Sequence, residues 1–195
     1  MLRYAPRLIP AGSAPEGALV EPLIANPPSS PFREHELIPQ VAWMVERDGT
    51  FVHVPDSERP HLALMRGSAE LTKLDGTLTN ESLDQLPGSI VATNGEYAAE
   101  LFLDRDHLAA IHDILGTKLY LAAAPRRGRF LIGGVGAGLA GMRAFVDHVR
   151  SEHDAAPAAA RISPVTLLVR DAAPTAVVGE LQLAALAQAV GTSSR

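Results

Sequence analysis

The clearest alternation of apolar and polar positions surrounds the single tryptophan. Val41, Trp43 and Val45 are separated by single residues, and a period of two is typical of a β-strand. A glycine-containing turn over residues 47–50 follows, and residues 51–54 form the return strand. The pattern predicts a β-hairpin in which Trp43, as a lone aromatic in a strand, is a core anchor.

Two longer segments repeat apolar residues at helical spacing. In the first, residues 105–115, Asp104 is a natural N-cap and Gly116 stands where a left-handed C-cap belongs. The second is residues 139–153, and a shorter stripe over residues 183–190 predicts a final short helix. The buried stripe of the second helix is expected to comprise Met142, Phe145, Val146 and Val149.

Further apolar runs before and between these helices are predicted as strands. They are residues 89–93, 96–103, 118–124, 129–135, 165–170 and 176–181. The connections at residues 125–128 and 171–174 are short, which requires antiparallel neighbours. The sequence therefore predicts an α+β fold: a mainly antiparallel sheet built from hairpins, with the two principal helices on one face.

Two regions are less regular. Seven prolines punctuate residues 1–33 and exclude long helices, so this part is predicted as an irregular arm with a short extended piece at residues 18–24. The arm is expected to pack on the body, to reach a partner subunit or to be loosely held. Between the hairpin and residue 89, residues 62–69 suit one helical face, and residues 79–82 look like the start of a short helix. A single α+β domain is expected over residues 34–195.

The amino-acid composition excludes several functional classes for this protein. The chain has 195 residues, of which 47% are apolar, enough for a sizeable core. A net charge of −5 argues against nucleic acid as a partner, because a nucleic-acid-binding surface is normally basic. There is no cysteine, which excludes disulfide scaffolds and thiolate chemistry. No apolar stretch is long enough for a membrane helix, so a cytoplasmic protein is expected.

A glycine-rich turn matches the GxGxxG pattern of dinucleotide-binding folds, with glycines at Gly136, Gly138 and Gly141. Three features oppose that interpretation. The nearest suitable acid, Asp171, lies 30 residues beyond Gly141, where about 20 is usual. The motif begins after two thirds of the chain, and the strand before it is expected to be antiparallel. We interpret the run as a small-residue turn that packs a helix against a sheet, and expect no cofactor.

A compact basic group, Arg126, Arg127 and Arg129, occupies the predicted hairpin turn of an acidic protein. Such a group can bind a phosphate, a carboxylate or an acidic partner protein. The simpler interpretation is a solvated hairpin tip that keeps the sheet edge soluble.

The seven histidines do not indicate a metal site. His107 and His112 are five residues apart, as are His148 and His153, and on a helix this spacing rotates by about 140°. Neither pair therefore converges, although a site built from distant histidines stays open. No nucleophile elbow, P-loop or kinase motif is present, so no catalytic residue is named.

Several features occur together in a recognisable order. They are the Pro31-Phe32 entry, the strand LIPQVAWMVERDG with FVHV, the strand at residues 96–103, the Asp104-capped helix, and KLYLAAAPRRGRFLIGG with its following helix. Over about residues 31–178 this order resembles the YtpQ-like group of uncharacterised bacterial proteins. The chain departs from the group at Arg126-Arg127-Gly128, where an Arg-Asp pair is usual, and in a shorter segment around ESLDQLPG. Because the group has no established activity, the resemblance implies a fold and no reaction.

The sequence favours a non-catalytic protein-interaction module, such as an accessory, chaperone-like or immunity-type protein. Its acidic surface suits a basic partner, and its arm and hairpin edges suit self-association. The alternative is a small-molecule or nucleotide-binding protein that uses Arg126, Arg127 and the Gly133–Gly141 turn.

Overall fold

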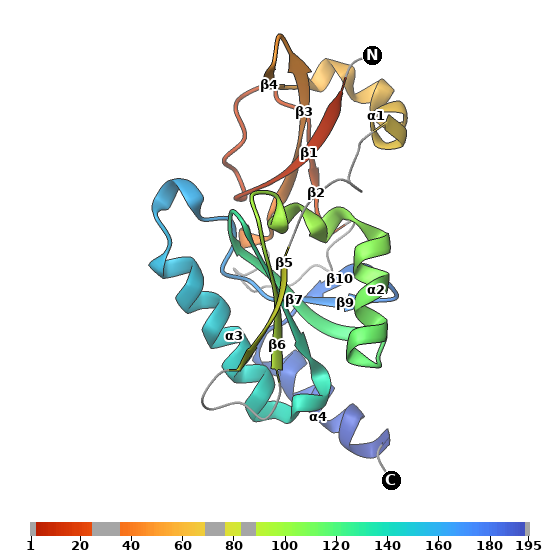
Figure 1. Cartoon of the computed structure of the whole chain (residues 1–195), viewed down its shortest axis with the longest axis vertical. Coiled ribbons are helices and arrows are strands. Elements are labelled where there is room, and N and C mark those ends of the chain that lie inside the picture. The colour runs from red at the N-terminus through yellow and green to blue at the C-terminus, as the bar shows by residue number, and fades with distance from the viewer. Residues whose placement is uncertain (1–2, 25–35, 69–76, 83–88, 194–195) are drawn as a thin grey trace.

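The computed structural model describes residues 3–24, 36–68, 77–82 and 89–193. Two antiparallel sheets and four α-helices form this part of the chain (Figure 1). The predicted α+β class with hairpin-built antiparallel sheets is confirmed. The helices are α1 (Leu62–Ser68), α2 (Arg105–Leu115), α3 (Gly138–Ala155) and α4 (Glu180–Ser193).

The larger sheet has six strands in the order β10-β9-β7-β8-β6-β5. They are β5 (Thr77–Ser82), β6 (Ser89–Asn94), β7 (Leu119–Arg126), β8 (Arg129–Gly134), β9 (Leu167–Arg170) and β10 (Ala173–Val177). All neighbours are antiparallel, and for β7–β8 and β9–β10 the short connections predicted this. The β9–β10 turn consists of Asp171 and Ala172, both at positive φ, which matches the twist of a two-residue hairpin.

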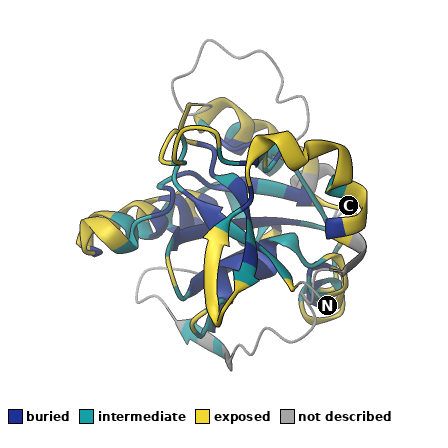
Figure 2. Cartoon of the chain, turned by 90° about the horizontal axis from the view of Figure 1, so that it is seen from above, coloured by how far each residue is buried: buried dark blue, intermediate teal, exposed yellow. Residues whose placement is uncertain are grey.

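Helices cover both faces of this sheet. Adjacent strand residues point to opposite faces, so Tyr120 packs in one core with Ile111 of α2, and Leu121 packs in another with Phe145 of α3. Helix α4 joins the second core. Figure 2 shows mainly buried strands at the centre and exposed residues on the helices around them. The prediction that both principal helices lie on one face is wrong. The sequence feature that indicated helices on both faces was the unbroken apolar run of residues 119–124, which is typical of a strand buried on both faces.

A second, smaller sheet has β3 at its centre, with β1 on one edge and with β2 and β4 on the other. Its strands are β1 (Tyr4–Ile9), β2 (Val20–Pro22), β3 (Gln40–Arg47) and β4 (Thr50–His53). Residues 4–9, predicted as part of an irregular arm, therefore form a paired strand. Pro6 is compatible with this strand. Glu46 N donates to Arg3 O, and hydrogen-bonded pairs alternate with non-hydrogen-bonded pairs along β1 and β3. Pro6 therefore lies in a non-hydrogen-bonded pair, and its nitrogen faces away from β3.

Other local predictions have clear outcomes. The Asp104 carboxylate accepts from the N–H groups of Asp106 and His107, and Gly116 adopts positive φ, so both predicted caps of α2 are confirmed. The strand predicted at residues 96–103 is wrong, because a buried 3₁₀ helix, η4 (Ala98–Leu103), occupies it. A short apolar run does not distinguish a buried strand from a buried helix. The helix expected to start at residues 79–82 is also wrong, because they belong to β5, and residues 83–88 lie outside the described residues.

A buried carboxylate, Glu100, joins η4 to the small sheet. Its Oε1 accepts from Leu8 N at 3.4 Å and from Arg7 Nη1 at 3.5 Å, at the outer edge of β1. The Arg7 guanidinium also lies 4.1 Å from the centre of the Tyr97 ring. Only 3% of Glu100 is exposed, and burial raises the pKa of its carboxyl although Arg7 opposes the shift. The ionised form is therefore incompletely compensated in the folded protein.

We expect Glu100→Gln to gain stability relative to the wild type as pH rises from about 4 to 7. Burial raises the pKa of Glu100 in the folded protein above its pKa in the unfolded chain. The stability that the protonated carboxyl provides is therefore present below the pKa of the unfolded chain, and it is lost as pH rises through the pKa of the folded protein. Glutamine does not ionise and escapes this loss. Urea unfolding of both proteins at the two pH values measures the difference, and the exposed Glu16→Gln is the control. A difference that does not change with pH would contradict the prediction.

Candidate functional site

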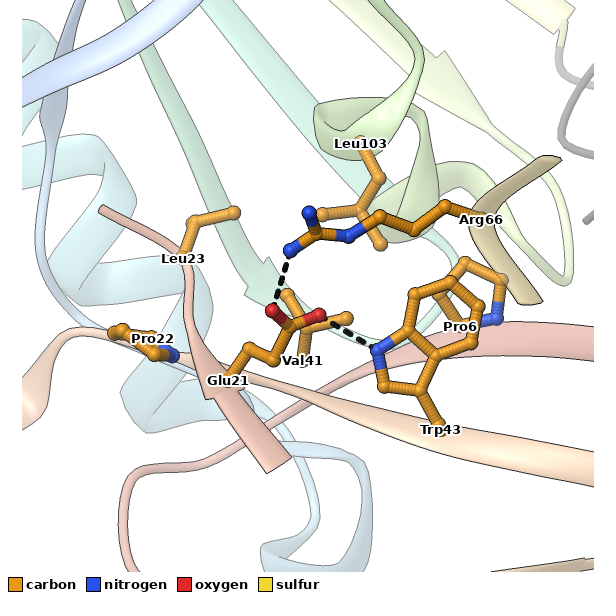
Figure 3. A pocket seen from close by; sticks show the side chains of 8 residues that line it. All are labelled: Pro6, Glu21, Pro22, Leu23, Val41, Trp43, Arg66 and Leu103. Carbon is orange, nitrogen blue, oxygen red and sulfur yellow. Dashed lines mark hydrogen bonds and ion pairs between the residues drawn. The ribbon is translucent and has the colours of Figure 1, made fainter. Parts of the chain in front are cut away.

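A pocket lies between the small sheet, α1 and η4, and we call it the Glu21 pocket (Figure 3). One face of the small sheet carries Pro6, Val41 and Trp43. At one end of this face, Trp43 packs in a core with Met65 of α1. At the other end, Val41 packs in the core that contains η4. A cavity of about 330 Å³ remains between these two coverings. Its lining residues are Pro6, Glu21, Pro22, Leu23, Val41, Trp43, Arg66 and Leu103.

The polar part of the pocket is one carboxylate with two donors. Glu21 pairs with Val41 across β2 and β3, which directs its side chain to the face that carries Trp43. Glu21 Oε2 accepts from Trp43 Nε1 at 2.8 Å, and Oε1 accepts from Arg66 Nη2. Figure 3 shows the carboxylate between the indole and the guanidinium. The Glu21 side chain is 16% exposed and that of Arg66 is 61% exposed, so the acid is fixed and its cation faces solvent.

The remaining lining side chains are apolar, and this combination defines what the pocket can hold. Pro6, Leu23 and Leu103 offer walls for aliphatic groups, and Glu21 offers a negative charge at one point. Pockets of this kind bury the body of a ligand and fix its orientation through a few polar contacts. The group that fits is a cation on an apolar stem.

The structure divides the three arginines that the sequence placed in one basic tip. Arg126 and Arg129 are cross-strand partners on the face covered by α3, and Arg126 Nε donates to Glu152 Oε2 of that helix at 3.1 Å. Arg127 is exposed in the turn. The three side chains therefore do not form one binding group.

Arg129 is almost fully buried, with 5% of the residue exposed, so a solvated tip is the wrong interpretation for this residue. Its guanidinium bonds both carboxylate oxygens of Glu81, at 2.7 and 2.5 Å, and reaches Asn94 Oδ1 at 2.7 Å and Glu152 Oε1 at 3.1 Å. The hydrogen bond from Arg129 holds the pKa of the Glu81 carboxyl below its usual value. These contacts tie β5, β6, β8 and α3 together, so the role of Arg129 is structural.

A second cavity, of about 440 Å³, lies beside this ion cluster. Its polar lining residues are Arg126, His148, Ser151 and Glu152. Glu152 already accepts from Arg126 and Arg129, and its Oε1 lies 3.8 Å from His148 Nε2. Glu152 is thus held by two arginines, and one of them, Arg129, is buried and cannot leave. The Glu21 carboxylate has a single ion-pair partner, the exposed Arg66, so we take the Glu21 pocket as the candidate site.

The glycine motif lies away from both cavities. Gly136 lies in the short 3₁₀ turn before α3, Gly138 is the first residue of α3, and Gly141 is buried within that helix. They lie at the opposite end of β8 from Arg129, roughly 17 Å along a six-residue strand. The structure therefore does not combine the arginine turn and the Gly133–Gly141 turn in one site. Since β8 is antiparallel to both neighbours, the motif is not part of a dinucleotide-binding βαβ unit.

The histidines on α2 make packing contacts. The His107 ring centre lies 5.9 Å from that of Phe130, and the His112 ring centre lies 5.9 Å from that of Tyr120. Across the described ranges, no three histidine or acidic side chains are arranged to hold a metal ion. None of the helices in these ranges is long and apolar enough to span a membrane.

Sequence reasoning did not identify Glu21 or Arg66 as site residues. Both lie in regions where the sequence showed little regularity, and only the pairing of β2 with β3 brings Glu21 to Trp43. One signal was present. The N–H of a buried tryptophan needs an acceptor, so placing Trp43 in the core implied a nearby polar partner.

No family model, curated protein or solved structure matches this chain. Membership of the YtpQ-like group stays a prediction. The assignment of a function therefore depends on the geometry of the Glu21 pocket and its surroundings.

Proposed function

We propose that this chain is a non-catalytic protein-interaction module, and that its partner binds at the Glu21 pocket. The observation that supports this is the carboxylate of Glu21 in apolar walls, fixed by Trp43 and paired with the exposed Arg66. Each carboxylate oxygen accepts a hydrogen bond, and the donor on Oε1 is the exposed Arg66, which supports recognition of an external donor group in its place.

Exposed apolar side chains near this end of the molecule support a protein as the partner. Leu64 of α1 is 73% exposed, and Phe51 and Val52 of β4 are 39% and 38% exposed. β4 is also an edge of the small sheet. Exposed apolar residues beside an edge strand are typical of surfaces that another chain covers. The net charge of −5 favours a basic partner. An accessory, chaperone-like or immunity-type role in the cytoplasm, with self-association as one mode, stays part of this proposal.

Site-specific photo-cross-linking tests the proposal. A photoreactive phenylalanine analogue at position 64, or at position 52, is expected to give a discrete adduct with one partner chain in cells. The same analogue at Ile114, which is 51% exposed, is the matched apolar control on a different helix, α2. Adducts of equal yield at positions 64 and 114 would contradict the proposal, as would their absence at positions 52 and 64.

A further inference from the structure

We propose that the Glu21 pocket binds an arginine side chain of the partner protein, which takes the place of Arg66. This inference rests on the proposed function above and identifies the group that is recognised. Arg66 is then an internal occupant that the partner must displace.

The pocket already holds a guanidinium, and this shows which chemistry it accepts. Arg66 Nη2 donates to Glu21 Oε1, while the other carboxylate oxygen is held by the Trp43 indole at 2.8 Å. The indole bond does not involve Arg66, so the carboxylate keeps its orientation when Arg66 leaves. The site is thus preorganised for an incoming donor.

Arg66 is suited to exchange. Its side chain is 61% exposed, and it lies on the seven-residue helix α1, too short to be stable without tertiary contacts. Met65 holds that helix in the core with 1% exposure, so the arginine can leave the pocket while the helix stays packed. Movement of one long exposed side chain requires no change in the fold.

Exchange also avoids the main energetic cost. A partly buried carboxylate without a cation is strongly destabilising, so Glu21 favours the entry of another cation whenever Arg66 departs. The apolar walls of Leu23 and Leu103 suit the methylene stem of that residue. Arginine is favoured over lysine because a guanidinium is less strongly hydrated than an ammonium group.

Fluorescence of the native protein tests the inference directly, because Trp43 is the single tryptophan and its N–H bonds the recognition carboxylate. The probe is a tryptophan-free peptide with capped termini and one central arginine, and the matched peptide carries neutral citrulline instead. We expect a saturable change in Trp43 emission with the arginine peptide and none with the citrulline peptide. The change should weaken with added salt.

Three variants sharpen the test. Arg66→Met should strengthen peptide binding about tenfold, the gain expected if the internal pair is closed nine-tenths of the time. Glu21→Gln should weaken binding at least tenfold, while circular dichroism checks its fold. Arg105→Met removes the same charge from an exposed position on α2 and should leave binding unchanged.

Equal binding of both peptides, or weaker binding by Arg66→Met than by Arg105→Met, would overturn the inference. Tighter binding of free arginine than of the capped peptide would overturn the assignment to a protein partner. If these experiments fail while cross-linking at position 64 succeeds, the interaction module stands and the arginine exchange does not. If cross-linking fails and the peptide results hold, the pocket chemistry stands and the proposed docking surface does not.

Discussion

Arg129→Met is expected to lower the free energy of unfolding at neutral pH by roughly 3 kcal/mol. The substitution keeps the apolar stem but leaves Glu81 and Glu152 without their shared cation. Removing one partner of a buried pair costs about 3–5 kcal/mol. The lower end applies because the Glu81 and Glu152 side chains are 31% and 20% exposed, which allows water to compensate in part.

The cost of this substitution should depend on pH. The hydrogen bond from Arg129 lowers the pKa of Glu81, so the stability from this pair is present above the unfolded pKa, near 4.5, and is lost as pH falls through the folded pKa. The difference between wild type and Arg129→Met is therefore largest at neutral pH and shrinks in acid.

Urea unfolding at pH 7 and at about pH 3.5 measures both effects. Arg127→Met is the matched control, because Arg127 is exposed in the turn just before Arg129, and it should change the free energy of unfolding by less than about 0.5 kcal/mol. Equal costs for the two variants would show that Arg129 is not held as the structure describes. A cost independent of pH would exclude Glu81 as its main partner.

Gly133→Ala is expected to cost about 2 kcal/mol, in the range of overpacked cores. Gly133 lies on the face of β8 covered by α3, and an added Cβ would lie 2.7 Å from Phe145 Cδ2. The Phe145 ring is 2% exposed, so it has little room to move. The absence of a side chain at Gly133 thus allows α3 to pack close to the sheet.

Gly134→Ala is the matched control, since a Cβ there meets nothing within 4 Å and the residue has φ of −75°. Its expected effect is small or stabilising. Phe145→Leu combined with Gly133→Ala should show a favourable coupling in a double-mutant cycle, because the smaller side chain relieves the contact. Additive costs, or equal effects at positions 133 and 134, would contradict this explanation of Gly133.

The best sequence predictions are those whose causes are local. Asp104 and Gly116 bound α2 as expected, because a cap depends on residues within one helical turn. The turn at Asp48 and Gly49 joins β3 and β4 as expected, with both residues at positive φ. Rejection of the glycine motif as a dinucleotide site also rested on a local feature, the short connection before β8.

Apart from the wrong secondary structure at residues 79–82 and 96–103, the wrong or missing predictions concern contacts between distant residues. An amphipathic stripe shows that a helix packs against the sheet but does not show which face of the sheet it covers. The prediction therefore placed α2 and α3 on the same face. Arg129 gave no sign of burial because Glu81 and Glu152 come from β5 and α3. A charged residue enters a core only when partners arrive from elsewhere in the chain.

By itself the sequence determined the α+β class, the hairpins, the capped helix α2 and the helical stripe of α3, because these depend on periodicity and on short-range turn and cap chemistry. Only the tertiary structure decided that β1 and β2 join β3, that helices cover both faces of the larger sheet, and that Glu21 meets Trp43 and Arg66. The physical reason is that a carboxylate's environment, and hence its use, is set by side chains that sequence spacing does not bring together. The Glu21 pocket exists only after α1 and η4 have packed near the small sheet.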